Sequence, residues 1–473
     1  MPQDNRFFNS QEFKEMLHVY EEAQRNGESV YMDCDDLVSV AEYYNLFGTL
    51  DQSVKAVEYA MQLFPSATAP LVFRARIAFM IEKDIDKAKR YVDMIEDITD
   101  LDYYYIKAEI LLVENRLEDA EAYLHDVYGR LGDEQRADFV IDVAALYVDY
   151  SLFNQAQRWL DLSEEYDDED YQELRGQIAF GHGDYEESEQ MFNQLLDKDA
   201  FNITYWNQLA SAQYMRDDAT ASMQSSEFAL AINPCDYDAL LNKANCLFAL
   251  GNFQEALEYY RRFNYISPDS EVGELYEGMT LFNLGRVEEG VEHLKTAEEL
   301  SLHDNDEYLH LIYTELAYCL SVLGKYDEAL EYLEGATLYE GGNPQELVAL
   351  KGSILLLSGN ENEGLELFHK AIETSGHSPV IIFRVATYIF EAGYIPLAYQ
   401  VLHSLLDHAS DDWCDGWSYL AYCCKSMHKH EEYLQALTTA CERNPVEVKT
   451  ILGNLFPEGL NTSEYVEYAK QHS

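Results

Sequence analysis

A small residue recurs every thirty-odd positions along this chain, and this period constrains the fold more than any other feature. All but one of the steps between successive members lie within two residues of 34, and the exception is 39. Markers at so constant a step predict a stack of similar units, in which each unit contacts only its neighbours. The members are Ala41, Ala75, Ala108, Ala144, Gly176, Ala210, Ala244, Gly278, Ala317, Gly352, Ala386 and Ala421.

A second series of small residues follows the first at a distance of about twelve positions. Apolar residues at helical spacing surround both series, which predicts two amphipathic helices in each unit. A small residue where two helices cross lets their backbones approach, and larger apolar residues fill the space around the contact. The second series is Ser53, Ala88, Ala120, Ala156, Ser188, Ser222, Ala256, Gly290, Ala329, Gly364 and Ala398, and only the last unit departs from it, with Tyr433.

This pattern resembles the tetratricopeptide repeat, a pair of antiparallel helices of about 34 residues. The marks of that family are Leu37, Ala41, Tyr44, Ser53, Ala60 and Pro65 in the first unit, and Trp417, Ala421, Cys424, Ala440 and Pro445 in the last. The resemblance covers roughly Cys34 to Pro445. It implies an all-α fold, a right-handed solenoid of about twelve helix pairs. It implies no particular function beyond binding, because the fold serves many partners.

The expected organisation follows from where the period begins, lengthens and ends. We expect an N-terminal capping helix within 1–33, repeats over 34–300, an insertion loop at 301–309, further repeats over 310–446 and capping helices over 447–473. An apolar stripe in Gln11–Arg25 predicts the first capping helix. The single step of 39 predicts the loop, where two stacks can flex against each other. Thr462 or Ser463 is the expected N-cap of the last helix.

The charge of the chain excludes one class of partner. Asp and Glu number 87 against 32 Lys and Arg, a formal net charge of -55. Nucleic acids are polyanions that need clustered cations, so neither DNA nor RNA is an expected partner. The acid either keeps a long solenoid soluble or attracts a basic protein segment, and the sequence leaves both open. We find no stretch of about 20 apolar residues and no secretory signal, so insertion into a membrane is not expected and the cytoplasm is the expected compartment.

No pattern of residues predicts catalysis, a cofactor or a metal. The phosphate-binding, dinucleotide-binding, zinc-protease and nucleophile-elbow motifs are absent from the sequence. Cys423, Cys424, His428 and His430 cluster in sequence, but adjacent helical residues point about 100° apart, which disfavours a zinc site. The eight cysteines are scattered, and we expect reduced thiols, most of them in the core.

The expected binding surface is the concave groove that the resemblance implies, lined by the first helix of each pair. Its inward positions would be the second, fifth, ninth and twelfth of each unit. The twelfth often touches the neighbouring helix, so Phe248, Phe282 and Phe390 belong either to the groove or to the core. The candidate partner-binding residues are Asn207, Tyr214, Asn245, Phe248, Leu275, Met279, Phe282, Tyr318, Phe383 and Phe390.

These observations predict a non-catalytic scaffold or adaptor that holds a segment of a partner protein in the groove. Aromatic side chains would anchor the segment, and the acidic surroundings would steer it. Two alternatives remain at this point. The chain is a homo-oligomer built through its apolar surface, or it is the regulatory subunit of an enzyme complex. The oligomeric state does not follow from the sequence.

Overall fold

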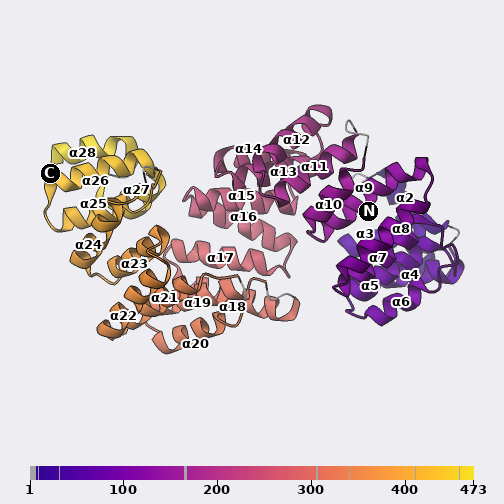
Figure 1. The fold of residues 1–473 in the computed structure, drawn as a ribbon, viewed down its shortest axis with the longest axis horizontal. Helices are drawn as coiled ribbons and strands as arrows, with labels where there is room; N and C mark the ends of the chain where they lie inside the picture. The colour runs from indigo at the N-terminus through magenta and orange to yellow at the C-terminus, as the bar shows by residue number, and fades with distance from the viewer. Residues whose placement is uncertain are drawn as a thin grey trace. The chain divides into compact units, whose positions relative to one another are not determined.

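The computed structural model describes residues 7–8, 10–30, 32–163, 168–304, 307–339, 341–410, 412–457 and 459–472. Within them the chain is helical and contains no strand, and twelve antiparallel helix pairs follow one another (Figure 1). The pairs are α3 (Cys34–Phe47) with α4 (Leu50–Leu63), α5 (Thr68–Met80) with α6 (Ile85–Val92), α7 (Leu101–Val113) with α8 (Leu117–Arg130), α9 (Asp133–Asp149) with α10 (Phe153–Leu160), α11 (Glu169–Gly181) with α12 (Tyr185–Lys198), α13 (Ile203–Met215) with α14 (Ala219–Ile232), α15 (Tyr237–Ala249) with α16 (Phe253–Ile266), α17 (Glu271–Asn283) with α18 (Val287–Asp304), α19 (Leu309–Val322) with α20 (Tyr326–Ala336), α21 (Pro344–Leu357) with α22 (Glu361–Thr374), α23 (Pro379–Glu391) with α24 (Ile395–Leu406), and α25 (Trp417–Ser426) with α26 (His430–Arg443).

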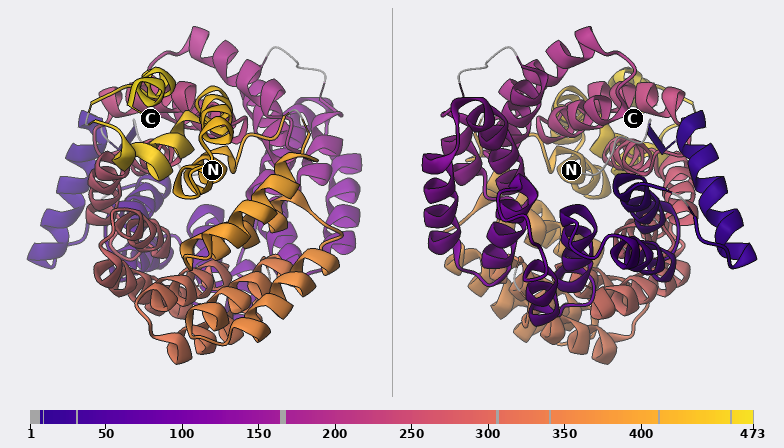
Figure 2. Two further views of the ribbon diagram at one scale, coloured as in Figure 1. Left: turned by 90° about the vertical axis from the view of Figure 1, so that its left-hand side faces the viewer. Right: turned by 90° about the vertical axis from the view of Figure 1, so that its right-hand side faces the viewer.

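The chain forms two compact units, Met1–Leu195 and Leu196–Ser473. Unit 1 holds the pairs from α3 to α11 with most of α12, and its core includes the fully buried rings of Phe139 and Trp159. Unit 2 holds the pairs from α13 onward, and one continuous apolar cluster runs through it from Leu275 to Ala469. Helices of both units are seen in cross-section and from the side in Figure 2. The division does not fall at 301–309, where the sequence suggested that two stacks flex.

The two series of small residues lie where the helices of a pair cross. Every alanine and serine in them has no exposed surface, and the glycines are buried. In unit 2 the Ser222 hydroxyl donates to the carbonyl oxygen of Ala210, 2.7 Å away. A Cβ placed on Gly290 would lie 2.8 Å from the carbonyl oxygen of Gly278, closer than van der Waals contact permits. The predicted close approach of paired helices is therefore confirmed, as is the all-helical solenoid.

The ends of the stack carry additional helices. The N-terminal helix α2 (Gln11–Asn26) begins after Ser10, whose side chain accepts from the Phe13 amide. After the last pair come α27 (Pro445–Leu452), η1 (Gly453–Leu455), η2 (Thr462–Glu464) and α28 (Tyr465–His472). The cap before the last helical segment is Asn461, not Thr462 or Ser463. Its side chain accepts from the Ser463 amide.

The expected insertion loop at 301–309 differs from the structure. Helix α18 continues to Asp304, with Ser301 buried, and α19 begins at Leu309. Residues 305–306 lie outside the described part of the chain. The extra residues of the 39-residue step therefore lengthen the second helix of this pair, because burial of Ser301 keeps the added turn packed against its neighbours.

Candidate partner-binding face

The first helices of successive pairs in unit 2 pack on one another and form a continuous layer, in which α17 contacts α19, α19 contacts α21 and α21 contacts α23. We call the surface of this layer, from α17 to α25, the first-helix face. Its aromatic side chains touch from pair to pair. The Phe282 and Tyr318 ring centroids are 5.1 Å apart, and Phe390 lies 5.1 Å from both Tyr419 and Tyr422. Partly exposed rings thus run along this face.

The first-helix face is concave around Tyr318. This side chain, on α19, donates a hydrogen bond of 2.8 Å to Glu391 on α23, and its ring centroid lies 6.0 Å from that of Tyr388, also on α23. These contacts pass over α21, the first helix of the intervening pair. A side chain on one first helix can touch the first helix two pairs away only where the layer of first helices curves inward. Helices α19 and α23 therefore approach each other over α21 at this point.

Ionisable side chains around Tyr318 make no ion pairs within the described residues. Glu315, on α19, makes no hydrogen bond or ion pair within the described residues, and protein surrounds it on most sides although water reaches part of it. Burial raises the pKa of Glu315 to about 7, and the positive charge of Arg384 offsets only part of that effect. Arg384 itself makes no ion pair within the described residues. Burial also raises the pKa of Glu391, while its hydrogen bond from Tyr318 acts in the opposite direction.

Carboxylates whose pKa is raised by burial are concentrated on first helices in both units. Among the described residues, Glu447 on α27 is the one such group elsewhere, and no second helix carries any. Many of these carboxylates remain in contact with water. Their pKa is raised because protein surrounds each carboxylate on its other sides. The first-helix members are Asp36, Glu42, Asp102, Asp142, Asp149, Asp170, Asp238, Glu315 and Glu391.

The structure separates the candidate residues into two groups. Seven of them keep partly exposed side chains on first helices: Tyr214, Phe248, Met279, Phe282, Tyr318, Phe383 and Phe390. The rings of Phe248, Phe282 and Phe390 also pack against the apolar clusters, so these side chains contribute to the core and to the surface at once.

The other three candidates make contacts within the fold, although Asn245 remains partly exposed. Leu275 has no exposed surface and belongs to the core, because its position on α17 faces the partner helices. Asn207 is 8% exposed and donates to Asp236 at 2.8 Å, and Asn245 accepts from the Tyr260 hydroxyl at 2.8 Å. Each of the two side-chain amides expected to hold a partner's backbone thus makes one internal hydrogen bond, through Nδ2 of Asn207 and Oδ1 of Asn245.

Sequence reasoning missed the sixth position of the unit. Glu315, Arg384 and Tyr419 occupy it in three pairs, two residues before the small-residue marker. A signal was present, because two of these three residues carry charge on helices that are otherwise mostly apolar. It went unrecognised because the inward positions taken from the family pattern omit the sixth.

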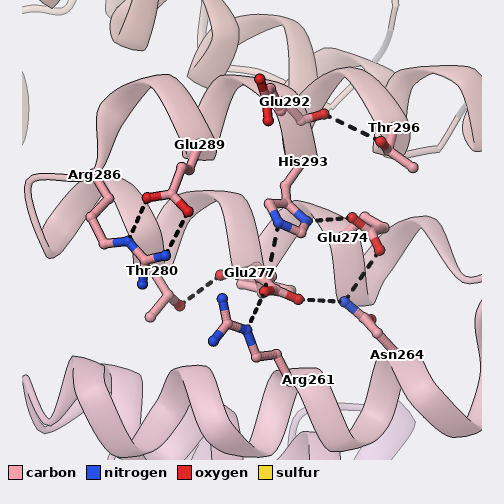
Figure 3. Close-up of polar contacts among 11 residues, drawn as sticks. Arg261, Asn264, Glu274, Glu277, Thr280, Arg286, Glu289, Glu292, His293 and Thr296 are labelled. Carbon is pink, nitrogen blue, oxygen red and sulfur yellow. Dashed lines mark hydrogen bonds and ion pairs between the residues drawn. The ribbon is translucent and has the colours of Figure 1, made fainter.

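A separate polar network joins α16, α17 and α18 (Figure 3). Nδ1 of His293 lies 2.7 Å from Glu274, and its Nε2 lies 3.7 Å from Glu277, which also accepts from Arg261 at 2.8 Å. Asn264 donates to Glu277 at 2.9 Å. The hydrogen bond to Glu274 is the main cause that raises the pKa of His293. The network links one repeat to the next, and each carboxylate in it has a partner, unlike Glu315.

The cysteine and histidine cluster of the last pair does not converge. Cys423 and Cys424 are fully buried, whereas His428 and His430 are not. No group of three or more His, Cys, Asp or Glu side chains in the described part of the chain is placed to hold a metal ion. None of the helices described there has both the length and the apolar character needed to cross a bilayer.

Comparison with known proteins locates the similarity in the repeats. A family model described as "Tetratricopeptide repeat" matches residues 237–270, the pair α15 and α16. The BBSome complex member BBS4 of Bos taurus is 25% identical over 174 residues, which cover 37% of this chain and 32% of that protein. The matched segment thus spans about a third of that relative.

Solved structures resemble the chain in the same way. A thermophilic tetratricopeptide-repeat protein of Thermus thermophilus is 20% identical, with a TM-score of 0.34, and the match covers 40% of this chain and 100% of that one. The Cut9-Hcn1 hetero-tetramer of APC/C provides a chain that is 12% identical, with a TM-score of 0.40, over 97% of this chain and 93% of its own.

Proposed function

We propose that this chain, whose repeats are similar to tetratricopeptide repeats, is a non-catalytic adaptor that holds a basic segment of a partner protein on the first-helix face. The observation that carries the proposal is the concave stretch around Tyr318, where partly exposed aromatic rings lie near Glu315 and Glu391, neither of which makes an ion pair within the described residues. We place this adaptor in the cytoplasm, where thiols stay reduced, because all eight cysteines are free thiols.

The rings supply the apolar part of the interaction. Four rings are partly exposed and touch in two pairs, Phe282 with Tyr318 and Phe390 with Tyr419. Aromatic side chains dominate the energetics of protein interfaces, because they bury a large rigid area at a small cost in conformational entropy. A row of them on a curved surface fits an elongated segment better than a flat partner.

The carboxylates supply the preference for positive charge. Burial destabilises the charged form of a carboxylate, and this raises the pKa of Glu315 to about 7, with Arg384 offsetting only part of the effect. A lysine or arginine of a partner placed beside it would offset that cost. The excess of acid over the whole chain would also steer such a segment toward the protein.

Similarity to a subunit of a larger assembly also supports the proposal. BBS4 is by its name a member of a complex. An adaptor that brings one protein to others is consistent with that similarity, and the proposal concerns only this chain's repeats.

The experiment selects short random peptides on the full-length protein and then titrates a fluorescent copy of an enriched sequence. We expect enrichment of lysine or arginine next to aromatic or aliphatic residues. The double variant Glu315→Gln/Glu391→Gln should weaken binding by about tenfold or more, since it removes two carboxylates that face the cation. Binding to the native protein should strengthen between about pH 6 and pH 8, as Glu315 loses its proton.

A matched control keeps the loss of charge equal. Glu363→Gln/Glu366→Gln removes two carboxylates from α22, a second helix, and should change the affinity by less than about twofold. If both double variants weakened peptide binding equally, general attraction between opposite charges would explain the result, and Glu315 and Glu391 would have no specific role. Enrichment of acidic peptides would refute the proposal outright. Reversible self-association in sedimentation experiments, abolished by the first double variant alone, would instead favour a homo-oligomer.

A further inference from the structure

Five large apolar side chains are exposed at one edge of unit 1. They lie at the turns that join the two helices of the first pair and of the second pair, and each is between 39% and 56% exposed. Helix α3 contacts α5 along the stack, so the two turns lie side by side. We call this surface the edge patch. Its members are Leu46, Phe47, Leu50, Met80 and Ile81.

The edge patch repeats at equivalent positions of two successive pairs. Leu46 and Met80 each stand five residues after the small-residue marker of their pair, and the next residue is again large and apolar. In no other pair are both of these positions occupied by large apolar side chains that are exposed. Single exposed apolar residues are normal on a protein surface, whereas a contiguous group of them marks an interaction site.

The charge of this edge differs from that of the whole chain. Residues 46–56 and 80–90, which carry the patch, contain five lysines and arginines and four aspartates and glutamates. The whole chain has 32 of the former against 87 of the latter. Lys87 pairs with Glu82 at 2.7 Å, whereas Lys83 is exposed and makes no ion pair within the described residues. The apolar side chains are thus bordered by nearly balanced charges.

We propose that the edge patch binds the same patch of a second copy of this chain, forming a dimer with two-fold symmetry. Such a contact needs a surface that is complementary to itself, and an apolar centre bordered by both signs of charge meets this condition. The ammonium group of Lys83 is available to face a carboxylate of the second copy. The dimer does not depend on the first-helix face, which lies in unit 2.

The charge of the chain favours this edge over other surfaces for a contact between copies. Two chains with a formal net charge of -55 repel each other over most of their surfaces. A strongly basic partner would gain little at an edge that carries five lysines and arginines of its own. Five apolar side chains are fewer than the roughly 20–30 residues that each protein contributes to a standard interface, so we expect a dissociation constant of about 1–100 μM.

Sedimentation velocity of the full-length protein tests the proposal. Over concentrations from about 1 to 200 μM the protein should change from monomer to dimer. Raising the salt concentration from about 50 to 500 mM should strengthen the association by about threefold or more, because salt screens the repulsion between the acidic surfaces. A contact made mainly by pairs of opposite charge would weaken instead, which would contradict an apolar contact.

A charged pair of variants connects the association to the patch. Leu46→Glu/Met80→Glu places a negative charge in the patch at each turn and should weaken the association by about tenfold or more at either salt concentration. The matched control is Met215→Glu/Val322→Glu, which adds the same charge at the same position of the pairs α13–α14 and α19–α20, where the side chains are 48% and 50% exposed. The control should change the association by less than about twofold.

A second variant tests the charge balance without touching the apolar side chains. Lys83→Glu should weaken the association by about fivefold or more at low salt and by less at high salt. Lys325→Glu, at the equivalent position of the turn between α19 and α20, should leave it unchanged within about twofold. If hydrogen exchange shows that Leu46→Glu/Met80→Glu has lost protection in α3 or α5, the comparison of Lys83→Glu with Lys325→Glu decides the result.

The proposal is refuted if the native protein stays monomeric at about 200 μM in high salt. Association that the two double variants weaken equally, or that Leu46→Glu/Met80→Glu leaves intact, also refutes it, because the contact would then lie elsewhere. Association abolished by Glu315→Gln/Glu391→Gln would place the contact on the first-helix face and contradict the edge patch.

Discussion

Gly290→Ala tests whether the helices of the α17–α18 pair are held at a distance that only glycine permits. The new Cβ would lie 2.8 Å from the carbonyl oxygen of Gly278 and 3.4 Å from the backbone nitrogen of Phe282. Both neighbours are backbone atoms, which cannot rotate away as a side chain can. The substitution therefore requires that the two helices move apart.

The expected magnitude combines two opposing effects. Alanine is preferred over glycine inside a helix by about 1 kcal/mol, which favours the variant. Overpacking of a closely packed contact costs about 1–3 kcal/mol, and backbone obstruction places this case in the upper part of that range. The free energy of unfolding should therefore fall by about 1–2 kcal/mol on balance.

Hydrogen exchange of the α17 and α18 amides is the suitable assay, because a repeat array does not unfold as a single two-state unit. Protection of those amides should fall, and that of distant pairs should change little. The double variant Gly278→Ala/Gly290→Ala should cost less than the sum of the two single changes, since one outward shift accommodates both methyl groups. The pair α15–α16 shows that such a spacing exists, with Ala244 and Ala256 at the matching positions.

Gly129→Ala is the matched control for helix propensity. Gly129 lies in α8, and no atom comes within 4 Å of a Cβ placed there. This variant should gain stability, by up to about 1 kcal/mol. If Gly290→Ala also gained stability, the close approach of paired helices would not depend on the small residues, and the packing argument would be wrong.

Two further predictions concern ionisable groups. The hydrogen bond from His293 to Glu274 raises the pKa of His293, so the folded state holds this proton more tightly. The resulting stabilisation is present below the unfolded pKa of about 6.5 and is lost as pH rises through the raised value, so the stability difference between wild type and His293→Gln should shrink from about pH 5.5 to pH 8.5 in chemical denaturation. Glu447 accepts from the amides of Gly416 and Ser418 at 2.8 and 3.2 Å, at the start of α25. Glu447→Ala should cost about 1–2 kcal/mol, seen as faster exchange of the first-turn amides of α25, and unchanged exchange would contradict that role.

The fold follows from the sequence to the level of single helix pairs, because the small residues at a crossing are a local requirement of packing. Ala41 and Ser53, or Gly352 and Gly364, are identifiable without coordinates because no larger side chain fits between the two helices. The boundary between the two units is not predictable in this way. The period runs through Leu195 unchanged, and no gap or proline marks the division there.

The candidate site depends on curvature, which no single repeat encodes. Tyr318 was predicted from its position, but its contacts with Tyr388 and Glu391 arise only because the layer of first helices bends over α21. The importance of Glu315 likewise depends on what encloses it. The buried state of Leu275 shows the converse, since a rule for inward positions taken from other repeats fails where the position faces the partner helices.

The positions of the acidic residues help to explain why the chain contains so many of them. If the acidic residues served solubility alone, they could all lie on the exposed second helices, where a charge lowers the stability of the fold very little. Several instead stand on first helices, where surrounding protein makes their charge unfavourable, and Glu315 does so without any ion pair in the described residues. Natural sequences retain locally unfavourable groups mainly where function requires them. We propose that a cationic partner accounts for the acidic first-helix positions, and the comparison of Glu315→Gln/Glu391→Gln with Glu363→Gln/Glu366→Gln tests this against solubility.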